Sequence, residues 1–355
     1  MKKIEQIISL LTCALLMLAV AINRDGRVFG YDVVSEEPGE NMSAIYEKDG
    51  YIVVSTKEIG KGIVGYGGPV PLDIYIEDGK IAKVVPGKNS ESPRYFNTLA
   101  ESGFIDSWNG LSLADALNLT PDAVSGATFS STAVSSGVAC GISYYLDNPV
   151  SVSKASDQLT EPKQIAAVIV VLSAAIIPLF YKNRKYRIVQ QVLNIAVLGF
   201  WTGSFISLSL ITSYLSNGMN IAVSIVPVLL LAVAFIMPLF GKKNHYCNWV
   251  CPMGSMQELA GQIIPFKLKI SQRTAKYLNV FREILWFAIM FVMWTGTGFA
   301  VMDYEPFTAF MFKQAAPAVL AICIAFVLLS FVVVRPYCRF VCPTGTLMKM
   351  SEKNN

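Results

Sequence analysis

The sequence has few charged residues, a single histidine and few cysteines. Only 15% of its 355 residues are Asp, Glu, Lys or Arg, against about 25% in an ordinary soluble domain, so the chain is not wholly soluble. The single histidine, His245, excludes a His-rich metal site and a haem held by two histidines of one chain. Seven cysteines are too few for a disulfide scaffold, and residues 23–163 contain only Cys140.

The charges are unevenly distributed. Residues 23–163 hold 19 of the 25 acidic residues but only 11 of the 29 basic ones. This acidic segment is long enough to form a globular domain with its own core. Elsewhere the basic residues lie beside apolar stretches and form no single polar face, so we expect no binding of nucleic acid.

Six stretches are apolar and about long enough to cross a membrane, which takes about 20 residues. They are residues 4–22, 164–181, 188–212, 221–240, 283–302 and 315–334. With a cytoplasmic N-terminus, the cytoplasmic segments carry 17 basic residues, whereas the outer loops Ser216 to Asn220 and Asp303 to Gln314 carry only Lys313. This positive-inside bias predicts a bundle of about six transmembrane helices with both termini cytoplasmic.

These patterns predict three parts: a transmembrane anchor at residues 1–22, an extracytoplasmic domain at 23–163 and a polytopic membrane domain at 164–355. We interpret the first segment as an uncleaved anchor, although Ala19 to Ala21 resembles a signal-peptidase site. Either alternative exports the acidic domain. We expect Glu305 at the outer rim, Trp286 at a membrane interface and His245 at the membrane boundary.

The acidic segment has the pattern of a small α+β domain. Residues 72–76 and 80–85 alternate around Glu77-Asp78-Gly79, which predicts a hairpin, and residues 51–55 form another expected strand. Apolar residues at Val134, Val138, Ile142 and Leu146 predict a helix over residues 130–146.

Hydroxyl side chains and a glycine precede that helix, in the run Asp-Ala-Val-Ser-Gly-Ala-Thr-Phe-Ser-Ser-Thr at residues 122–132. Backbone N–H groups and the dipole at a helix N-terminus attract phosphate. An ordinary Ser/Thr-rich helix cap is the alternative.

Residues 122–128 resemble the Asp-x-x-Ser/Thr-Gly-Ala-Thr acceptor motif of FMN-binding domains. Such domains occur in sodium-pumping NADH:quinone oxidoreductases, Rnf complexes and the nitrous-oxide-reductase regulator family, in which a flavin transferase esterifies FMN phosphate to the last Thr. The resemblance includes Gly-Tyr-Gly-Gly-Pro-Val at residues 65–70 and covers about residues 50–147. It implies covalent FMN on Thr128, with Ser125, Gly126 and Ala127 shaping the loop and Asp122 as the motif acid.

The membrane part contains an internal repeat. Tyr-Cys-Asn-Trp-Val-Cys-Pro-Met-Gly-Ser at residues 246–255 aligns with Tyr-Cys-Arg-Phe-Val-Cys-Pro-Thr-Gly-Thr at 337–346, and both copies follow outward-to-inward segments. Four thiolates can therefore converge at one face, which is the number that an iron–sulfur cluster takes. They belong to Cys247, Cys251, Cys338 and Cys342. Nearby basic residues favour the thiolate form; they are Lys242, Lys243, Arg335 and Arg339.

The cysteine pattern alone leaves alternatives open. A structural zinc site accepts the same spacing, thiol–disulfide exchange needs only one pair, and a stable disulfide is disfavoured on a reducing face. Cys-x-x-x-Cys-Pro after a transmembrane helix is similar to the membrane part of the nitrous-oxide-reductase regulator and periplasmic-nitrate-reductase quinol-oxidising families. This resemblance covers about residues 164–346 and implies a 4Fe-4S cluster in a bacterial cytoplasmic membrane protein.

Together these features predict a transmembrane electron-transfer protein, more a conduit than a complete enzyme. Electrons would pass from a cytoplasmic donor or membrane quinol, through the cluster and FMN, to an extracytoplasmic redox acceptor. A flavin transferase and membrane lipid are the other expected partners. A membrane thiol-disulfide reductase and a redox-sensing or assembly factor for a partner enzyme are the alternatives.

Overall fold

The computed structural model describes residues 2–33, 44–89, 91, 93–124, 127–146, 162–181, 183–218, 225–268, 270–295, 305–312 and 315–350. The chain divides into two compact units. Residues 24–154 and 213–218 form one, here called the sheet unit, and residues 1–23, 155–212 and 219–355 form the other, the helical unit. Each is described by itself.

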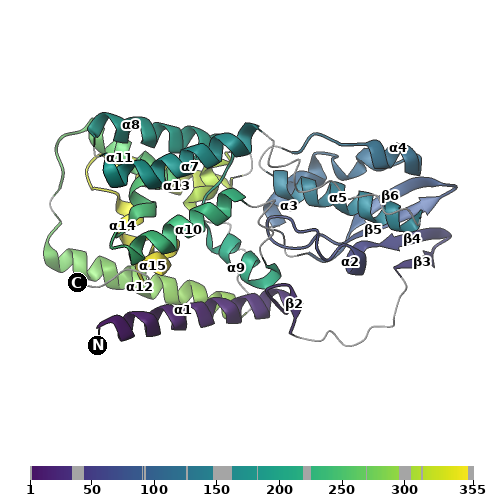
Figure 1. The fold of residues 1–355 in the computed structure, drawn as a ribbon, viewed down its shortest axis with the longest axis horizontal. Coiled ribbons are helices and arrows are strands. Elements are labelled where there is room, and N and C mark those ends of the chain that lie inside the picture. Colours follow the sequence, from purple (N-terminus) through teal and green to yellow (C-terminus); the bar gives the residue numbers. More distant parts are fainter. Residues whose placement is uncertain are drawn as a thin grey trace. The chain divides into compact units, whose positions relative to one another are not determined.

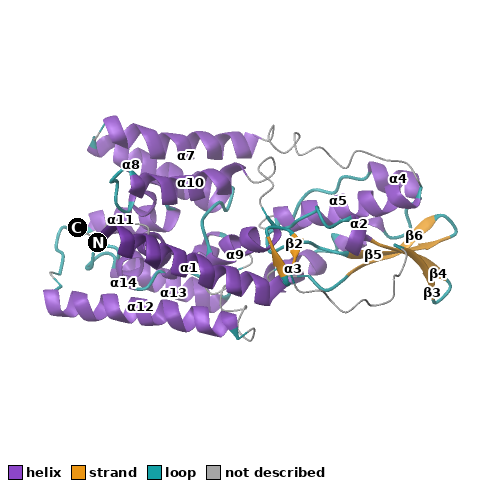
Figure 2. Cartoon of the chain, turned by 60° about the horizontal axis from the view of Figure 1, so that its bottom comes forward, coloured by secondary structure: helices purple, strands orange, loops and turns teal. Residues whose placement is uncertain are grey.

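The sheet unit contains a four-stranded antiparallel sheet in the order β3-β4-β5-β6 (Figure 2). Its strands are β3 (Ile45–Lys48), β4 (Tyr51–Ser55), β5 (Leu72–Glu77) and β6 (Lys80–Pro86), and a separate pair comprises β1 (Arg27–Val28) and β2 (Tyr31–Asp32). The predicted hairpin is confirmed: Ile74 pairs with Val84, and Asp78 and Gly79 have φ of 47° and 72°, as the two central residues of a tight hairpin turn require.

One long helix packs on this sheet and completes the core. The helices are α2 (Thr56–Ile59), α3 (Pro93–Glu101), the 3-10 helix η1 (Ile105–Trp108), α4 (Leu113–Asn118) and α5 (Thr128–Tyr145). On α5, Val134, Val138 and Ile142 are fully buried in one cluster with Leu72 and Ile74 of β5. The predicted helix and the α+β character of this part of the chain are therefore confirmed.

The helical unit consists of helices that run mostly along its length (Figure 1). They are α1 (Lys2–Asp25), α7 (Pro162–Phe180), α8 (Arg184–Leu193), the π-helix η2 (Asn194–Trp201), α9 (Leu208–Asn217), α10 (Ile225–Leu239), the π-helix η3 (Tyr246–Val250), α11 (Pro252–Ile263), α12 (Gln272–Trp294), the 3-10 helix η5 (Pro306–Phe310), α13 (Pro317–Leu329), α14 (Pro336–Phe340) and α15 (Pro343–Met350). The end of α1 lies beside the end of α12, where Asn23 donates a hydrogen bond to the carbonyl of Trp294.

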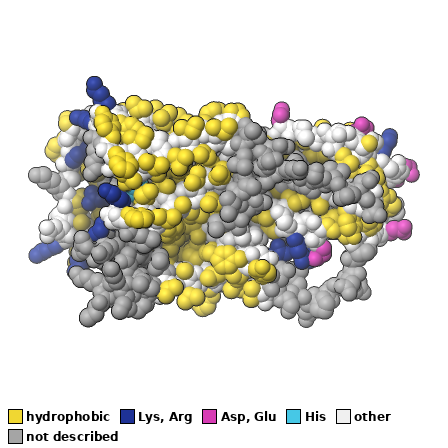
Figure 3. All heavy atoms as spheres, in the orientation of Figure 1, with side chains coloured by type: hydrophobic (Ala, Val, Ile, Leu, Met, Phe, Trp, Pro, Cys, Tyr) yellow, Lys and Arg dark blue, Asp and Glu magenta, His cyan; other side chains and the backbone are white. Residues whose placement is uncertain are grey.

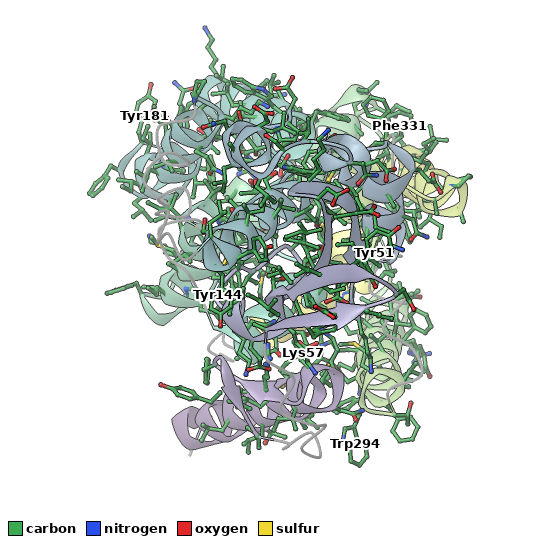
Figure 4. All side chains as sticks on the ribbon, turned by 90° about the vertical axis from the view of Figure 1, so that its right-hand side faces the viewer. Tyr51, Lys57, Tyr144, Tyr181, Trp294 and Phe331 are labelled. Atoms are coloured by element: carbon green, nitrogen blue, oxygen red, sulfur yellow. The ribbon has the colours of Figure 1, made fainter. Side chains whose placement is uncertain are left out.

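Two of the described helices, α7 and α12, are long and apolar enough to cross a membrane, and α10 and α13 are apolar but shorter. Hydrophobic side chains cover much of the visible face of the helical unit, and Lys and Arg side chains gather at its left-hand end (Figure 3). Trp294 points outward from the end of α12 (Figure 4). These features indicate a membrane protein, and the six predicted spans remain a prediction.

Two predicted apolar segments are not continuous helices. Residues 188–212 were expected to form one span, but the helix ends at Trp201 and the chain is irregular up to α9, with Gly203 at φ +60°. In the predicted segment 315–334 the helix is shorter than expected, because α13 ends at Leu329. Just after this end, Lys267 donates hydrogen bonds to the carbonyls of Ser330 and Phe331, at 3.1 and 2.6 Å. A cation on the last carbonyls stabilises a helix end.

Three residues expected at the membrane boundary lie inside the helical unit. Trp286 is fully buried, and His245 is buried with Nε2 3.1 Å from the carbonyl oxygen of Ala175. Glu305 is also buried, and its Oε1 accepts a hydrogen bond from the Thr344 hydroxyl at 3.0 Å. The expected exposure of Trp286 and Glu305 at a membrane surface was wrong, whereas the place of His245 at the membrane boundary stays a prediction. Burial of the Glu305 carboxylate is possible because Thr344, distant in sequence, supplies a hydrogen bond to it.

Candidate functional site

The predicted FMN attachment residue, Thr128, is the first residue of α5. Its side chain is exposed. The residue capping the helix is Ala127, and no side chain forms a capping hydrogen bond there among the described residues. The alternative of an ordinary Ser/Thr cap is therefore not supported, and the first N–H groups of α5 form the kind of helix N-terminus that binds an anion.

The other hydroxyls of the motif that the structure describes form hydrogen bonds within the protein. The Ser131 hydroxyl donates to the carbonyl of Ala127 at 2.9 Å and accepts from the backbone nitrogen of Val124 at 3.1 Å. Thr132 donates to the carbonyl of Thr128 at 2.9 Å, and Ser130 is buried against Glu91. Thr128 thus presents the exposed hydroxyl at this helix start. Asp122 is exposed too, whereas Ser125 and Gly126 lie outside the described residues.

A buried carboxylate, Glu91, joins the glycine-rich segment to the start of α5. Its Oε1 accepts the backbone N–H of Gly67 at 2.8 Å, and its Oε2 accepts the Ser130 hydroxyl. A Cβ atom on Gly65 would lie 2.4 Å from Glu91 Oε1, so the carboxylate leaves no room for a side chain there. Burial raises the pKa of Glu91, while the bonds from Ser130 and the glycine backbone oppose the shift.

Sequence reasoning missed Glu91, because nothing distinguishes it from the many exposed acids of the same segment. Its contacts place Tyr66 beside α5: the rings of Tyr66 and Phe129 lie 6.5 Å apart and are both half-buried. Arg24 also reaches this loop and donates to the carbonyl of Gly67. An exposed hydroxyl, an uncapped helix start and a neighbouring aromatic pair fit a phosphate-linked planar ring system.

In both cysteine repeats of the helical unit, the first cysteine lies in a short helix and the second stands directly before the next helix. Cys247 lies in η3 and Cys338 in α14, while Cys251 and Cys342 stand directly before α11 and α15. In both copies proline is the first residue of the following helix, where its missing N–H costs nothing. The turn between Cys247 and Cys251 is a π-helix.

The four cysteines converge. Cys338 interacts electrostatically with both cysteines of the first repeat, and so does Cys342. No disulfide joins these four cysteines in the described part of the chain. Among the described residues, no group of three or more Cys, His, Asp or Glu side chains is close enough for a single metal ion.

Hydrogen-bond donors surround the sulfurs, as an anionic cluster requires. The backbone nitrogen of Gly254 donates to Cys251 Sγ at 3.4 Å, and Gly345 donates to Cys342 Sγ at 3.2 Å. Gln257 Nε2 donates to Cys338 Sγ at 3.6 Å. A Cβ atom on Gly254 would lie 2.3 Å from the carbonyl oxygen of Cys247, so this turn requires glycine. The residues present therefore fit an iron–sulfur cluster.

Arg335 is the basic residue that enters this cysteine site. It donates to the carbonyl of Cys247 at 3.4 Å and to the side chain of Asn248, so it links the second repeat to the first. Glu258 pairs with Arg335 and also with Arg187, at 2.6 Å. The other predicted flanking cations, Lys242, Lys243 and Arg339, are exposed.

Burial favours the protonated form of the cysteine thiols. Burial raises the pKa of the Cys251 thiol to about 11, against the opposing effects of the Gly254 and Met253 backbone N–H groups and of Arg335. Iron would bind the thiolate form, so filling the site would release protons, and Arg335 would stabilise the remaining negative charge.

Comparison with known proteins finds two domain families in the chain. The FMN-binding domain family matches residues 65–143, which contain Thr128. The 4Fe-4S binding domain family matches residues 223–271 and 315–353, which contain the two cysteine repeats. The chain joins an FMN-binding domain to a 4Fe-4S binding domain. The resemblance drawn from the motifs is confirmed.

Two curated proteins are homologous to parts of the chain. "Putative electron transport protein YccM" of Escherichia coli (strain K12) is 26% identical over 137 residues, which cover 34% of this chain and 37% of that protein. "Protein NirI" of Paracoccus denitrificans (strain Pd 1222) is 28% identical over 124 residues, covering 32% of this chain and 18% of that protein. The matches thus span well under half of either relative. No solved structure matches the chain.

Proposed function

We propose that this protein carries electrons across a membrane between an iron–sulfur cluster and FMN. The cluster, a 4Fe-4S cluster, is held by Cys247, Cys251, Cys338 and Cys342, and FMN is esterified to Thr128. A flavin accepts electrons singly or in pairs and an iron–sulfur cluster passes them one at a time. One relative carries the name of an electron transport protein, which supports this function.

The observation that carries the proposal is the convergence of two cysteine pairs from distant repeats into one site. Donors from Gly254, Gly345 and Gln257 reach the sulfurs, and Arg335 links the repeats. These residues bind and orient the cluster and offset its negative charge. The buried positions of Cys251 and Cys342 exclude water from the sulfurs.

The proposed role of the sheet unit is to present the flavin. The Thr128 hydroxyl forms the phosphoester after a flavin transferase acts, and the N–H groups at the start of α5 stabilise the phosphate charge. Ser125, Gly126 and Ala127 shape the attachment loop and Asp122 is its acid. A covalent bond keeps the cofactor from being lost by dilution outside the cytoplasm.

We further propose a multi-pass protein of the bacterial cytoplasmic membrane, with both termini cytoplasmic and the FMN domain outside. The 17-to-1 distribution of basic residues supports this orientation. The apolar helices α7 and α12 support it as well. So does the contact of Asn23 with Trp294, which brings the C-terminal ends of α1 and α12 together, both of them predicted to face outward.

The proposed direction is from a cytoplasmic donor or membrane quinol to an extracytoplasmic acceptor such as a reductase. Within the described residues we identify no nucleophile or general base arranged for catalysis, so the protein acts as an electron-transfer subunit of an oxidoreductase system.

Inverted membrane vesicles test this function, because they expose the cytoplasmic face and enclose the FMN domain. The full chain is expressed anaerobically with a compatible flavin transferase, and its iron, sulfide and covalent flavin are measured. A membrane-impermeant reductant is then added outside. The flavin absorbance should bleach in the wild type but not in Cys338→Ser. Equal bleaching in both, or wild-type protein without iron and sulfide, would contradict the proposal and favour thiol exchange in the second case.

A further inference from the structure

Three charged side chains of the helical unit form one ion-pair group beside the cysteine site. Arg187 of α8 binds Glu258 of α11 through two parallel hydrogen bonds, from Nε to Oε1 at 2.6 Å and from Nη2 to Oε2 at 2.8 Å. Arg335, the residue that caps the start of α14, pairs with Oε2 of the same carboxylate. These three side chains, here called the Arg–Glu–Arg triad, therefore join segments that lie far apart in the sequence.

Both arginines of the triad contact the first cysteine repeat. Arg335 Nη1 donates to the carbonyl of Cys247 at 3.4 Å and to the side chain of Asn248. The guanidinium carbon of Arg187 lies 4.7 Å from the ring centroid of Trp249, within the range of a cation–π contact. Three consecutive residues of the first repeat are thus held by the two cations that Glu258 joins.

The backbone of Arg335 indicates a role for its side chain. Arg335 has φ +47° and ψ +60°, a left-handed conformation that is unfavourable for a residue with a long side chain. Asn244, at the equivalent position before the first repeat, has φ +52°, and asparagine adopts this conformation more readily. Strain of this kind persists where the surrounding contacts fix it, often at functional sites. The two repeats share the turn, and the second places a cation on it.

The triad is shielded from solvent. The side chain of Arg335 is 11% exposed and that of Glu258 is 18% exposed, whereas that of Arg187 is 32% exposed. Buried charges are screened by water and salt much less than surface charges. Arg335 also interacts electrostatically with cysteines of both repeats. A change in the net charge of the triad should therefore be felt at the sulfurs.

We propose that the Arg–Glu–Arg triad sets the reduction potential of the cluster, with Glu258 as a positioning residue; this inference rests on the proposed function. A reduced cluster carries one more negative charge than an oxidised one, so a nearby cation raises the potential and a nearby anion lowers it. Glu258 holds the Arg335 guanidinium against the first repeat and cancels part of its charge. Arg187 in turn cancels part of the charge of Glu258. No covalent bond forms or breaks in this effect.

The test is a redox titration of the full chain, purified anaerobically with its cluster. Glu258→Gln can still accept a hydrogen bond from Arg335 but lacks the negative charge. The equilibrium constant for reduction should therefore rise by about tenfold, a shift of about 59 mV for one electron. Arg187→Gln leaves the charge of Glu258 uncompensated, so the constant should fall. Arg184→Gln is the matched control, because it makes the same chemical change at an exposed residue of α8 and should leave the potential unchanged.

A conservative exchange separates charge from packing. Arg335→Lys keeps the positive charge and should keep the potential close to that of the wild type, whereas Arg335→Gln should lower the equilibrium constant by about tenfold. An ion pair that only stabilises the fold would not give opposite shifts when one or the other of its partners is neutralised.

The outcomes distinguish this inference from the proposed function. Wild-type protein without iron and sulfide overturns both. Where the wild type holds a cluster, any result other than a higher potential in Glu258→Gln and a lower one in Arg187→Gln overturns the triad inference alone. If Arg335→Gln fails to bind a cluster, the opposite shifts of the other two variants still decide the question.

Discussion

The backbone nitrogen of Gly67 donates a hydrogen bond to Glu91 Oε1 at 2.8 Å, between residues 24 positions apart. The other carboxylate oxygen accepts the hydroxyl of Ser130 on α5. One buried side chain therefore joins the glycine-rich segment to the helix start that carries Thr128. The shape of the proposed flavin attachment site depends on this connection.

Replacing Glu91 by Gln should change how the stability of the sheet unit depends on pH. Burial raises the pKa of Glu91 in the folded protein, so folding favours its protonated form. The contribution of Glu91 to the free energy of unfolding is greatest at pH values below the ordinary Glu pKa of about 4.3. This contribution decreases as the pH rises through the raised pKa of Glu91 in the folded protein. Glu91→Gln should remove this decline.

The measurement is the thermal unfolding midpoint of the full chain in detergent at a series of pH values, with unfolding monitored by flavin fluorescence. Asp106→Asn serves as the control, because Asp106 is an exposed acid of the same unit. The difference between wild type and Glu91→Gln should grow with pH. A constant difference would show that Glu91 does not titrate in this way.

Thr128→Ala should abolish covalent flavin, because the phosphoester requires a hydroxyl at that position. Denatured protein, expressed with a compatible flavin transferase, should then lack flavin fluorescence under ultraviolet light in the gel. Thr132→Ala is the matched control, since it makes the same chemical change one turn further along α5. Ser130→Ala should also keep its flavin. Covalent flavin in Thr128→Ala would disprove the assignment.

The two repeats should hold one shared cluster. Each provides only two cysteines and a cluster takes four protein ligands, while the electrostatic interactions link cysteines of both repeats. Cys247→Ser and Cys338→Ser should each lose nearly all iron and the same visible absorption bands. Cys323→Ser, in α13, should keep both. Retention of half the iron in each single variant, with none in the double variant, would instead indicate two sites.

Protease added to intact spheroplasts should remove residues 23–163 and spare a tag placed after Asn355. The expectation follows from the basic residues on the cytoplasmic segments, which disfavour export. Immunoblots for the tag and for the FMN domain measure the two events, and a lysed sample is the control for access. Loss of the tag without lysis would show that the orientation is inverted or that a span was miscounted.

Local features of the fold could be predicted from the sequence. The hairpin of β5 and β6, the strand β4 and the helix α5 follow from alternation, turn residues and helical spacing, all of which act between near neighbours. The paired cysteines followed by proline are equally local. These patterns were sufficient to recognise both cofactor domains, because each motif is contained in a short continuous segment.

Tertiary structure decided which polar groups are buried and which remain accessible. Glu91 and Ser130 are 39 residues apart, as are Glu305 and Thr344, and no periodicity reports contacts of that range. The hydrogen bond between Ile206 and Tyr246 also joins residues far apart in the sequence. The burial of Trp286 likewise depends on packing that no local pattern reports. A polar side chain is stable inside a protein only when distant partners satisfy it. The sequence by itself therefore determined the cofactor motifs, whereas only the folded chain exposed Thr128 and brought the two cysteine pairs into one site.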